Sequence, residues 1–174
     1  MKDRALLKKL KNIQLLLLDV DGVLTDGSLI YNDDGGETKV FNSKDGLGLR
    51  LARTAGIEVG IVTGRKSMAL RHRCDNLEIR YLFDGVADKA KMLTEIVART
   101  GIGPEKVAFV GDDLPDLPIM RRVGLAIAVA DAHDIIRQKA AWTTSAPGGR
   151  GAVREVCEAL LMAKGLWDEI IARY

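Results

Sequence analysis

Two aspartates, Asp19 and Asp21, have the residue types and the spacing best suited to chemistry in this chain. They directly follow the apolar run 15–18, and a short apolar run that ends at a turn signal is typical of a buried strand. Side chains two positions apart in an extended segment point the same way, so the two carboxylates repel each other. A cation would offset this repulsion, and Mg²⁺ prefers oxygen ligands. The pattern predicts a magnesium site, with a simple acidic turn as the alternative, since Asp-Gly favours turns.

A second polar cluster follows the apolar segment 57–62. Thr63 supplies a hydroxyl donor, and Gly64 lets the backbone come close to a ligand. Arg65 offers a planar guanidinium that suits an anion. These residues predict an anion-binding loop. The alternatives are a helix N-cap for Thr63 and a solvated surface charge for Arg65.

Two further clusters carry charge of opposite sign. Lys89 and Lys91 begin a helical pattern, and only one of them can serve a site because residues two apart do not share a helix face. Lys89 lies nearer the helix start. The alternative is that both are ordinary surface lysines.

Asp112, Asp113 and Asp116 follow the apolar run 107–110. One acid is enough to cap a helix, so three in five positions suggest a cation, with an acidic helix cap as the alternative.

The elements that must position these residues alternate along the chain. Helical patterns cover roughly residues 3–11, 44–54, 66–74, 88–99, 114–122 and 134–139, and a C-terminal helix and tail follow from about 151 to 174. Strands are predicted at 15–18, 57–62, 107–110, 124–129 and 142–144. This alternation predicts an α/β fold, with a parallel sheet and right-handed crossovers. Ligand sites of such sheets form at the carboxyl ends of the strands, where the clusters lie.

In this order, the four clusters resemble the motifs of the haloacid dehalogenase superfamily of phosphatases. The matching residues are the Asp-x-Asp-Gly-x-Leu-Thr pattern from Asp19, then Thr63, then Lys89, and the Gly-Asp-x-x-x-Asp pattern that ends at Asp116. The resemblance implies a Rossmann-like parallel sheet flanked by helices and a Mg²⁺-dependent phosphatase. Asp19 is then the nucleophile that forms an aspartyl-phosphate.

The resemblance also implies roles for the other residues. Asp21 acts as general acid and base, with its backbone carbonyl on the metal, and Thr63 holds a phosphate oxygen. Lys89 neutralises the nucleophile and the incoming phosphate. Asp112 is a direct metal ligand, as is Asp19. Asp116 orients water at the metal or Lys89, and Asp113 is either a ligand or a supporting residue.

One insertion, at about residues 27–42, breaks the alternation. Segments 28–31 and 38–41 flank a Gly-rich turn and predict a β-hairpin. The superfamily inserts its cap domains at this place, so a small hairpin stands in place of a cap and leaves the catalytic mouth open. An apolar edge hairpin would be sticky on a monomer. We therefore expect the hairpins to pair between subunits, in a homotetramer.

The segment 146–155 narrows the resemblance to one subfamily. It is similar to the Gly-Gly-x-Gly-Ala-x-Arg-Glu signature of 3-deoxy-D-manno-octulosonate 8-phosphate phosphatases. This implies hydrolysis of that sugar acid phosphate for lipopolysaccharide synthesis in a Gram-negative bacterium. Glycines 148 and 149 with Arg150 suggest a mobile cationic loop, in which Arg150 forks onto the substrate carboxylate, and Lys44 is a further candidate for substrate contact. A turn that caps the last helix is the alternative.

Two other functions compete with this one. A phosphatase for a related nine-carbon keto-deoxy sugar acid 9-phosphate would share all four motifs. A non-catalytic module that accepts phosphate on Asp19, or an oligomeric module, belongs to another class. Asp21 discriminates against a simple phosphate acceptor, which has no dedicated acid two residues after its nucleophile.

Length and composition fit one catalytic domain over residues 1–174. The chain has 174 residues, 47% of them hydrophobic, and a net charge of +2, which gives no argument for nucleic acid or membrane as a partner. We interpret its two cysteines, Cys74 and Cys157, as reduced thiols, because they form no disulfide framework. The first residues do not resemble a signal peptide, so the expected location is the cytoplasm.

Overall fold

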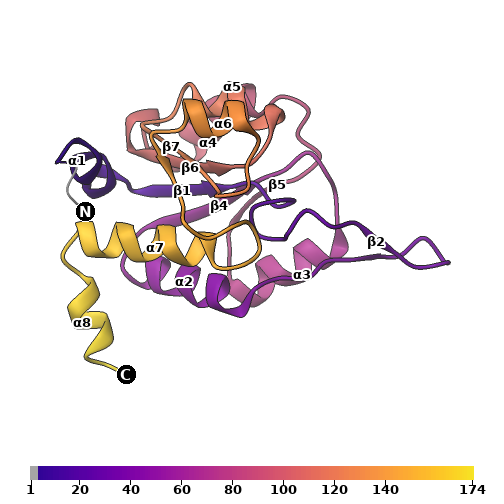
Figure 1. The fold of residues 1–174 in the computed structure, drawn as a ribbon, viewed down its shortest axis with the longest axis horizontal. Helices are drawn as coiled ribbons and strands as arrows, with labels where there is room; N and C mark the ends of the chain where they lie inside the picture. The colour runs from indigo at the N-terminus through magenta and orange to yellow at the C-terminus, as the bar shows by residue number, and fades with distance from the viewer. Residues whose placement is uncertain (1–3) are drawn as a thin grey trace.

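A six-stranded parallel sheet lies at the centre of the computed structural model, which describes residues 4–174 (Figure 1). The strand order is β5–β4–β1–β6–β7–β8. The strands are β1 (Leu15–Leu18), β4 (Glu58–Val62), β5 (Tyr81–Phe83), β6 (Val107–Gly111), β7 (Leu125–Ala128) and β8 (Trp142–Thr143). This arrangement confirms the parallel α/β fold predicted from the alternating pattern.

Helices cover both faces of the sheet (Figure 1). One layer contains α2 (Ser43–Thr54), α3 (Met68–Leu77) and α7 (Ala152–Ala163), and the other contains α4 (Lys89–Thr100), α5 (Leu117–Met120) and α6 (Asp134–Lys139). The remaining helical segments are α1 (Arg4–Asn12), α8 (Trp167–Ile171) and the short 3₁₀ turns η1 (Pro104–Lys106) and η2 (Leu114–Asp116). The expected start of the first helix at residue 3 lies outside the described residues. No helix within residues 4–174 has the length and apolar character needed to cross a bilayer.

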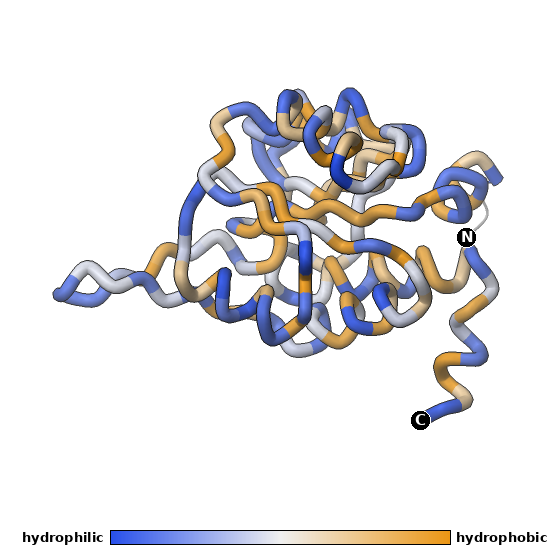
Figure 2. Tube along the Cα trace, turned by 180° about the vertical axis from the view of Figure 1, so that it is seen from behind, coloured by the Kyte–Doolittle hydropathy of each residue, from blue (hydrophilic) through white to orange (hydrophobic). Residues whose placement is uncertain are grey.

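Strand β1 holds the central position because its four leucines are apolar on both sides. All four are fully buried, and each contributes about 1.5–3 kcal/mol through burial. In Figure 2 the hydrophobic colour follows the central strands through the middle of the molecule. Leu18 pairs with Ile61 of β4 and with Val110 of β6, so these three strands end at the same edge of the sheet. The residues after them, which include Asp19 and Thr63, are thereby brought together.

The hairpin is present, but its strands are shorter than predicted. Strand β2 (Ile30–Tyr31) pairs with β3 (Glu37–Thr38) through two residue pairs only, where four-residue strands were expected. An isolated two-stranded ribbon is marginally stable, which explains why pairing does not extend further in a single chain. The hairpin projects from the body as an arm (Figure 1).

Two other elements differ from the sequence prediction. Strand β5 was not predicted, because it has only three residues and lies at the edge of the sheet. The helix expected over 114–122 is divided into η2 and α5, and each of these begins with a proline in its first turn, Pro115 and Pro118. Proline suits a first turn because its missing N–H has no intrahelical partner there.

Candidate active site

Asp19 lies at the bottom of a cavity of about 670 Å³ at the carboxyl edge of the sheet. Its backbone N–H donates to Val110 O at 3.1 Å, which continues the pairing of β1 with β6. Lys89 Nζ lies 2.9 Å from Asp19 Oδ1, and the Lys89 side chain is only 4% exposed. Lys91 points away, exposed, with Asp88 as its partner at 3.8 Å. Of the two lysines, Lys89 alone therefore faces the carboxylate of Asp19.

Asp116 holds Lys89 and the preceding loop in place. Its Oδ1 accepts from Lys89 Nζ at 2.6 Å, and its Oδ2 accepts from the backbone N–H groups of Asp112 at 2.9 Å and Asp113 at 3.4 Å. Asp113 is exposed, and its side chain accepts from Leu114 N, so it caps η2. The acidic cap and the acidic cluster are therefore both present, and Asp116 takes part in both.

The carboxylate of Asp112 completes the acidic cluster. Carboxylate oxygens of Asp19, Asp112 and Asp116 all lie within 4.8 Å of one another. Gly22, with φ of +82°, passes so close that a Cβ at this position would overlap the Asp112 carboxylate. Glycine is therefore required here both by the conformation and by the close approach.

This cluster carries more negative than positive charge, and the pKa values of its members are shifted. Burial, followed by repulsion from Asp116, raises the pKa of Asp19 to about 6, although Lys89 opposes this shift. Burial and repulsion from Asp116 and Asp19 raise the pKa of Asp112 to about 8. Burial lowers the pKa of Lys89, but the attraction of Asp19 and Asp116 outweighs it, so the ammonium stays charged.

Three carboxylates against one ammonium are the surroundings that a divalent cation stabilises, and oxygen donors fit Mg²⁺. Both oxygens of Asp116 already accept hydrogen bonds. The carboxylates of Asp19 and Asp112 are thus the groups of this cluster that would hold the ion. The backbone carbonyl of Asp21 stays a predicted third ligand.

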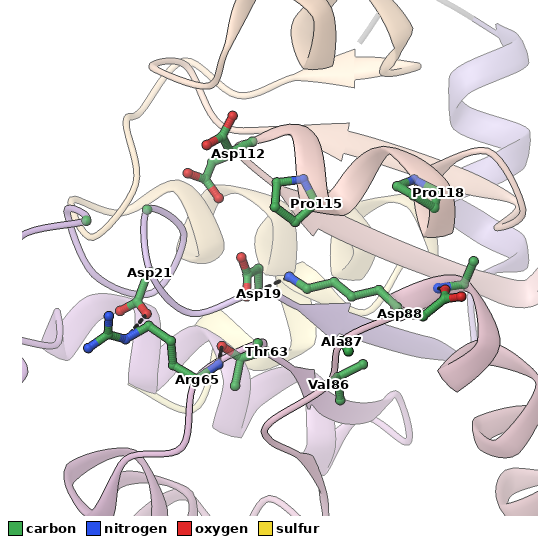
Figure 3. Close-up of a pocket in the computed structure, with 16 residues that line it drawn as sticks. Asp19, Asp21, Thr63, Arg65, Val86, Ala87, Asp88, Asp112, Pro115 and Pro118 are labelled. Carbon is green, nitrogen blue, oxygen red and sulfur yellow. Dashed lines mark hydrogen bonds and ion pairs between the residues drawn. The ribbon is translucent and has the colours of Figure 1, made fainter.

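Thr63 and Gly64 also line the cavity. Figure 3 shows Thr63 on the side of Asp19 opposite to Asp112. Thr63 is buried at the end of β4, and its N–H donates to Phe83 O at 3.0 Å. The alternative role of Thr63 as a helix cap is not observed, because Ser67 caps α3 by accepting from Leu70 N. A hydroxyl that faces the cavity is therefore available to a phosphate oxygen.

Asp21 is bound by Lys39 of the hairpin and by Arg65, which follows β4. Lys39 Nζ donates to Asp21 Oδ1, and Arg65 Nε lies 3.5 Å from Asp21 Oδ2. Arg65 Nη2 also donates to Tyr31 OH and to Glu37 Oε1, both at 2.7 Å. Sequence reasoning missed Lys39 and Glu37. Their spacing of two positions, which places both on one face of a strand, was the signal that could have found them.

Two predicted substrate residues lie outside the cavity of the single chain. Lys44 is exposed, and Arg150 is 68% exposed with its Nη2 3.6 Å from Asp26 Oδ2; neither belongs to the described residues that line the cavity. A mobile loop around Arg150 stays a prediction, although its two glycines are hydrogen-bonded in this structure. Gly149 N donates to Val23 O and Gly148 N to Asp131 Oδ1, both at 2.9 Å, so the segment is docked against the loop after β1.

Comparison with known proteins agrees with this geometry. Residues 82–154 match the model of the haloacid dehalogenase-like hydrolase family. The chain is 50% identical, over 161 residues, to the 3-deoxy-D-manno-octulosonate 8-phosphate phosphatase KdsC of Escherichia coli K12, and the match covers 92% of this chain and 86% of that protein.

Solved structures are similar as well. The phosphatase of the same name from Yersinia pestis has a TM-score of 0.93 at 44% identity, covering 95% of this chain and 89% of that one. The Moraxella catarrhalis enzyme, in complex with magnesium, phosphate and KDO, has a TM-score of 0.94 at 41% identity, covering 96% of each chain. The chain therefore belongs to the 3-deoxy-D-manno-octulosonate 8-phosphate phosphatases, within the haloacid dehalogenase-like hydrolases.

Proposed function

We propose that this protein hydrolyses 3-deoxy-D-manno-octulosonate 8-phosphate to the free sugar acid and inorganic phosphate, in lipopolysaccharide precursor synthesis. The observation that carries the proposal is the single cavity that holds Asp19, Lys89, Asp112 and Thr63 within reach of one phosphate group. It is the arrangement that phosphoryl transfer requires, since that reaction depends mainly on positioning and electrostatics.

In the first step a carboxylate oxygen of Asp19 attacks phosphorus and the bond from phosphorus to the sugar oxygen breaks. Lys89, 2.9 Å from Asp19, neutralises charge on the nucleophile and on the arriving phosphate. Thr63 donates to a phosphate oxygen. Asp21 transfers a proton to the departing sugar oxygen. When bound, Mg²⁺ neutralises further negative charge on the phosphate oxygens.

In the second step water hydrolyses the aspartyl-phosphate. Asp21, now ionised, takes a proton from the attacking water, and the bond between phosphorus and the Asp19 oxygen breaks. Inorganic phosphate leaves and both aspartates return to their starting states. The substrate's carboxylate and hydroxyl groups need polar partners, and Lys44, Arg65 and Arg150 stay our candidates for them. Of these three, Arg65 lines the cavity of the single chain.

The assembly and location of the enzyme form part of the same proposal. Apolar hairpin residues that are strongly exposed in the single chain support a homotetramer in which hairpins pair: Leu29, Ile30, Tyr31 and Val40. A cytoplasmic location is supported by the cysteines, Cys74 and Cys157, which are both buried and free. Free buried thiols are typical of a reducing compartment. We treat residues 1–174 as one catalytic domain.

Steady-state kinetics on a panel of keto-deoxy sugar acid phosphates, with Mg²⁺ and with a chelator, tests the function. We expect the eight-carbon 8-phosphate to be hydrolysed with the highest kcat/KM and the chelator to abolish turnover. Asp19→Asn should remove activity by a factor of about 10³ or more, because it removes the nucleophile. Preference for a nine-carbon 9-phosphate would overturn the substrate, and substantial turnover by Asp19→Asn would overturn the mechanism.

A further inference from the structure

The carboxylate of Asp21 is held by a cluster separate from the acidic cluster at Asp19. Lys39 Nζ bonds to Asp21 Oδ1 and also lies 3.4 Å from Glu37 Oε1. Arg65 lies against the other oxygen of Asp21 and bonds to the same Glu37 oxygen. Two acids and two bases cancel in charge here when both acids are ionised, which for Asp21 is the form that takes a proton from water in the second step. This cluster therefore needs no metal to balance it, unlike the one around Asp19.

Lys39 contacts Asp21 but does not itself line the cavity. Its side chain is only 2% exposed, and it is absent from the described residues that form the cavity wall. A buried ammonium is costly unless it is paired and hydrogen-bonded, and its two partners here are Asp21 and Glu37. Lys39 is therefore committed to these carboxylates and is not available to bind a phosphate.

The backbone around Asp21 is fixed, but its carboxylate is not fixed by the backbone. The N–H groups of Val23, Leu24 and Thr25 all donate to Val20 O, which sets the turn that carries Asp21. The carboxylate itself stays partly exposed. Among the described residues, Lys39 is the side chain that hydrogen-bonds to this carboxylate. Arg65 is its second ionic partner, and Figure 3 shows this contact.

We propose that Lys39 is a positioning residue, which holds the Asp21 carboxyl group in the orientation needed for proton transfer to the leaving group. The hairpin is thereby part of the catalytic apparatus, because β3 leads directly into Lys39. The proposal rests on the proposed function for the role of Asp21. It predicts that the contribution of Lys39 depends on how basic the leaving group is.

Single-turnover phosphoryl transfer in Lys39→Met tests this prediction with two substrates. The sugar acid phosphate releases a strongly basic alkoxide that needs a proton, whereas p-nitrophenyl phosphate releases a weakly basic phenolate that does not. General acid catalysis contributes about 10²–10⁴-fold, so losing the orientation of Asp21 should slow alkyl transfer by about tenfold or more. Aryl transfer should stay within about threefold of wild type, and KM for the sugar acid phosphate should change little. Lys39→Arg should restore most of the alkyl rate.

Three controls make the outcome decisive. Lys139→Met, at an exposed lysine in the last turn of α6, should leave both rates unchanged. In the Asp21→Asn background, Lys39→Met should add almost no further loss of alkyl transfer, because the two residues act as a unit. Lys39→Gln, whose shorter side chain carries no charge, should show the same unequal loss and serves as the test if Lys39→Met does not fold.

Equal loss on the alkyl and aryl substrates, full additivity with Asp21→Asn, or a change confined to KM would overturn the assignment of Lys39. Failure of the wild-type enzyme to hydrolyse the sugar acid phosphate at all would count against the proposed function instead. In that case the comparison is made with another alkyl phosphate that the wild type hydrolyses, and the role of Lys39 is still decided.

Discussion

At the scale of single residues, the excess negative charge around Asp19 determines how protons and metal compete. Burial and mutual repulsion raise the pKa of Asp19 to about 6 and that of Asp112 to about 8. A carboxyl group with a raised pKa in the folded state binds more protons there than in the unfolded chain. The stability of the metal-free protein therefore falls as pH rises through these pKa values. Mg²⁺ needs the ionised carboxylates, so it stabilises the protein most where protons have left.

The melting temperature should show this competition directly. We expect the increase in Tm caused by saturating Mg²⁺ to be largest at pH about 8.5 and to shrink steadily toward pH about 5.5. Asp112→Asn removes one ionised ligand and should abolish most of the increase at every pH. An increase in Tm that does not vary with pH would contradict the link between metal binding and these two carboxyl groups.

At the scale of elements, caps and close contacts join parts of the chain that are distant in sequence. Asn42 caps α2 by accepting from Lys44 N. Asp45 lies within α2 but accepts from the N–H groups of Gly151 and Arg154, so it serves the start of α7. This contact aligns α2 and α7 in the layer below the sheet. The sequence shows that Asp45 is suited to capping, but it does not show which helix is capped.

One closely packed glycine and one glycine with open space beside it offer a matched test of close packing. Gly149 and Gly101 both have positive φ, at +63° and +69°, yet a Cβ on Gly149 would overlap the backbone of Thr25 and Asp26, whereas Gly101 has open space. Gly101→Ala should lower the free energy of unfolding by about 1 kcal/mol, from backbone strain alone. Gly149→Ala should lower it by about 3 kcal/mol, because steric overlap is added. It should also reduce hydrolysis, since the displaced loop carries Asp21.

Urea unfolding and kcat/KM of the two variants measure these effects. Similar losses of stability in both variants, with full activity in Gly149→Ala, would show that the contact with the loop after β1 is unimportant.

The sequence was informative where a local pattern determines the structure. The run Leu15–Leu18 is apolar at every position, so its burial and its central place in the sheet follow directly. The residues after β1, β4 and β6 meet because parallel strands end at one edge. By contrast, β5 has three residues and no distinct pattern. The contact of Lys39 with Asp21 forms only because the hairpin brings Lys39 next to the loop after β1. Contacts of this kind depend on tertiary structure, which one sequence does not encode locally.

At the scale of the whole molecule, the projecting hairpin is a surface on which large apolar side chains are exposed. Val40 is 65% exposed and Tyr31 is 58% exposed. If the hairpins pair in the proposed tetramer, Val40→Asp should shift the protein to smaller species, because a charge cannot be buried in an apolar interface without a large cost. Light scattering coupled to size-exclusion chromatography measures the mass. Met162→Asp, at an exposed apolar position on α7, is the matched control and should leave the mass unchanged. An unchanged mass for Val40→Asp would mean that the interface lies elsewhere.

The strand order in the sheet differs from the strand order along the chain, so neighbouring strands are translated at different times. The ribosome makes β1 before its neighbours β4 and β6, and the glycines that dock behind its loop are made later still. At about 5–20 residues per second, roughly ten seconds separate the translation of Asp21 from that of Gly149. Until β4 has been made, the nascent chain displays a fully apolar strand with no neighbouring strand to pair with. Such a segment is a natural binding site for a chaperone, and the loop that carries Asp21 is fully packed only after Gly149 has been made.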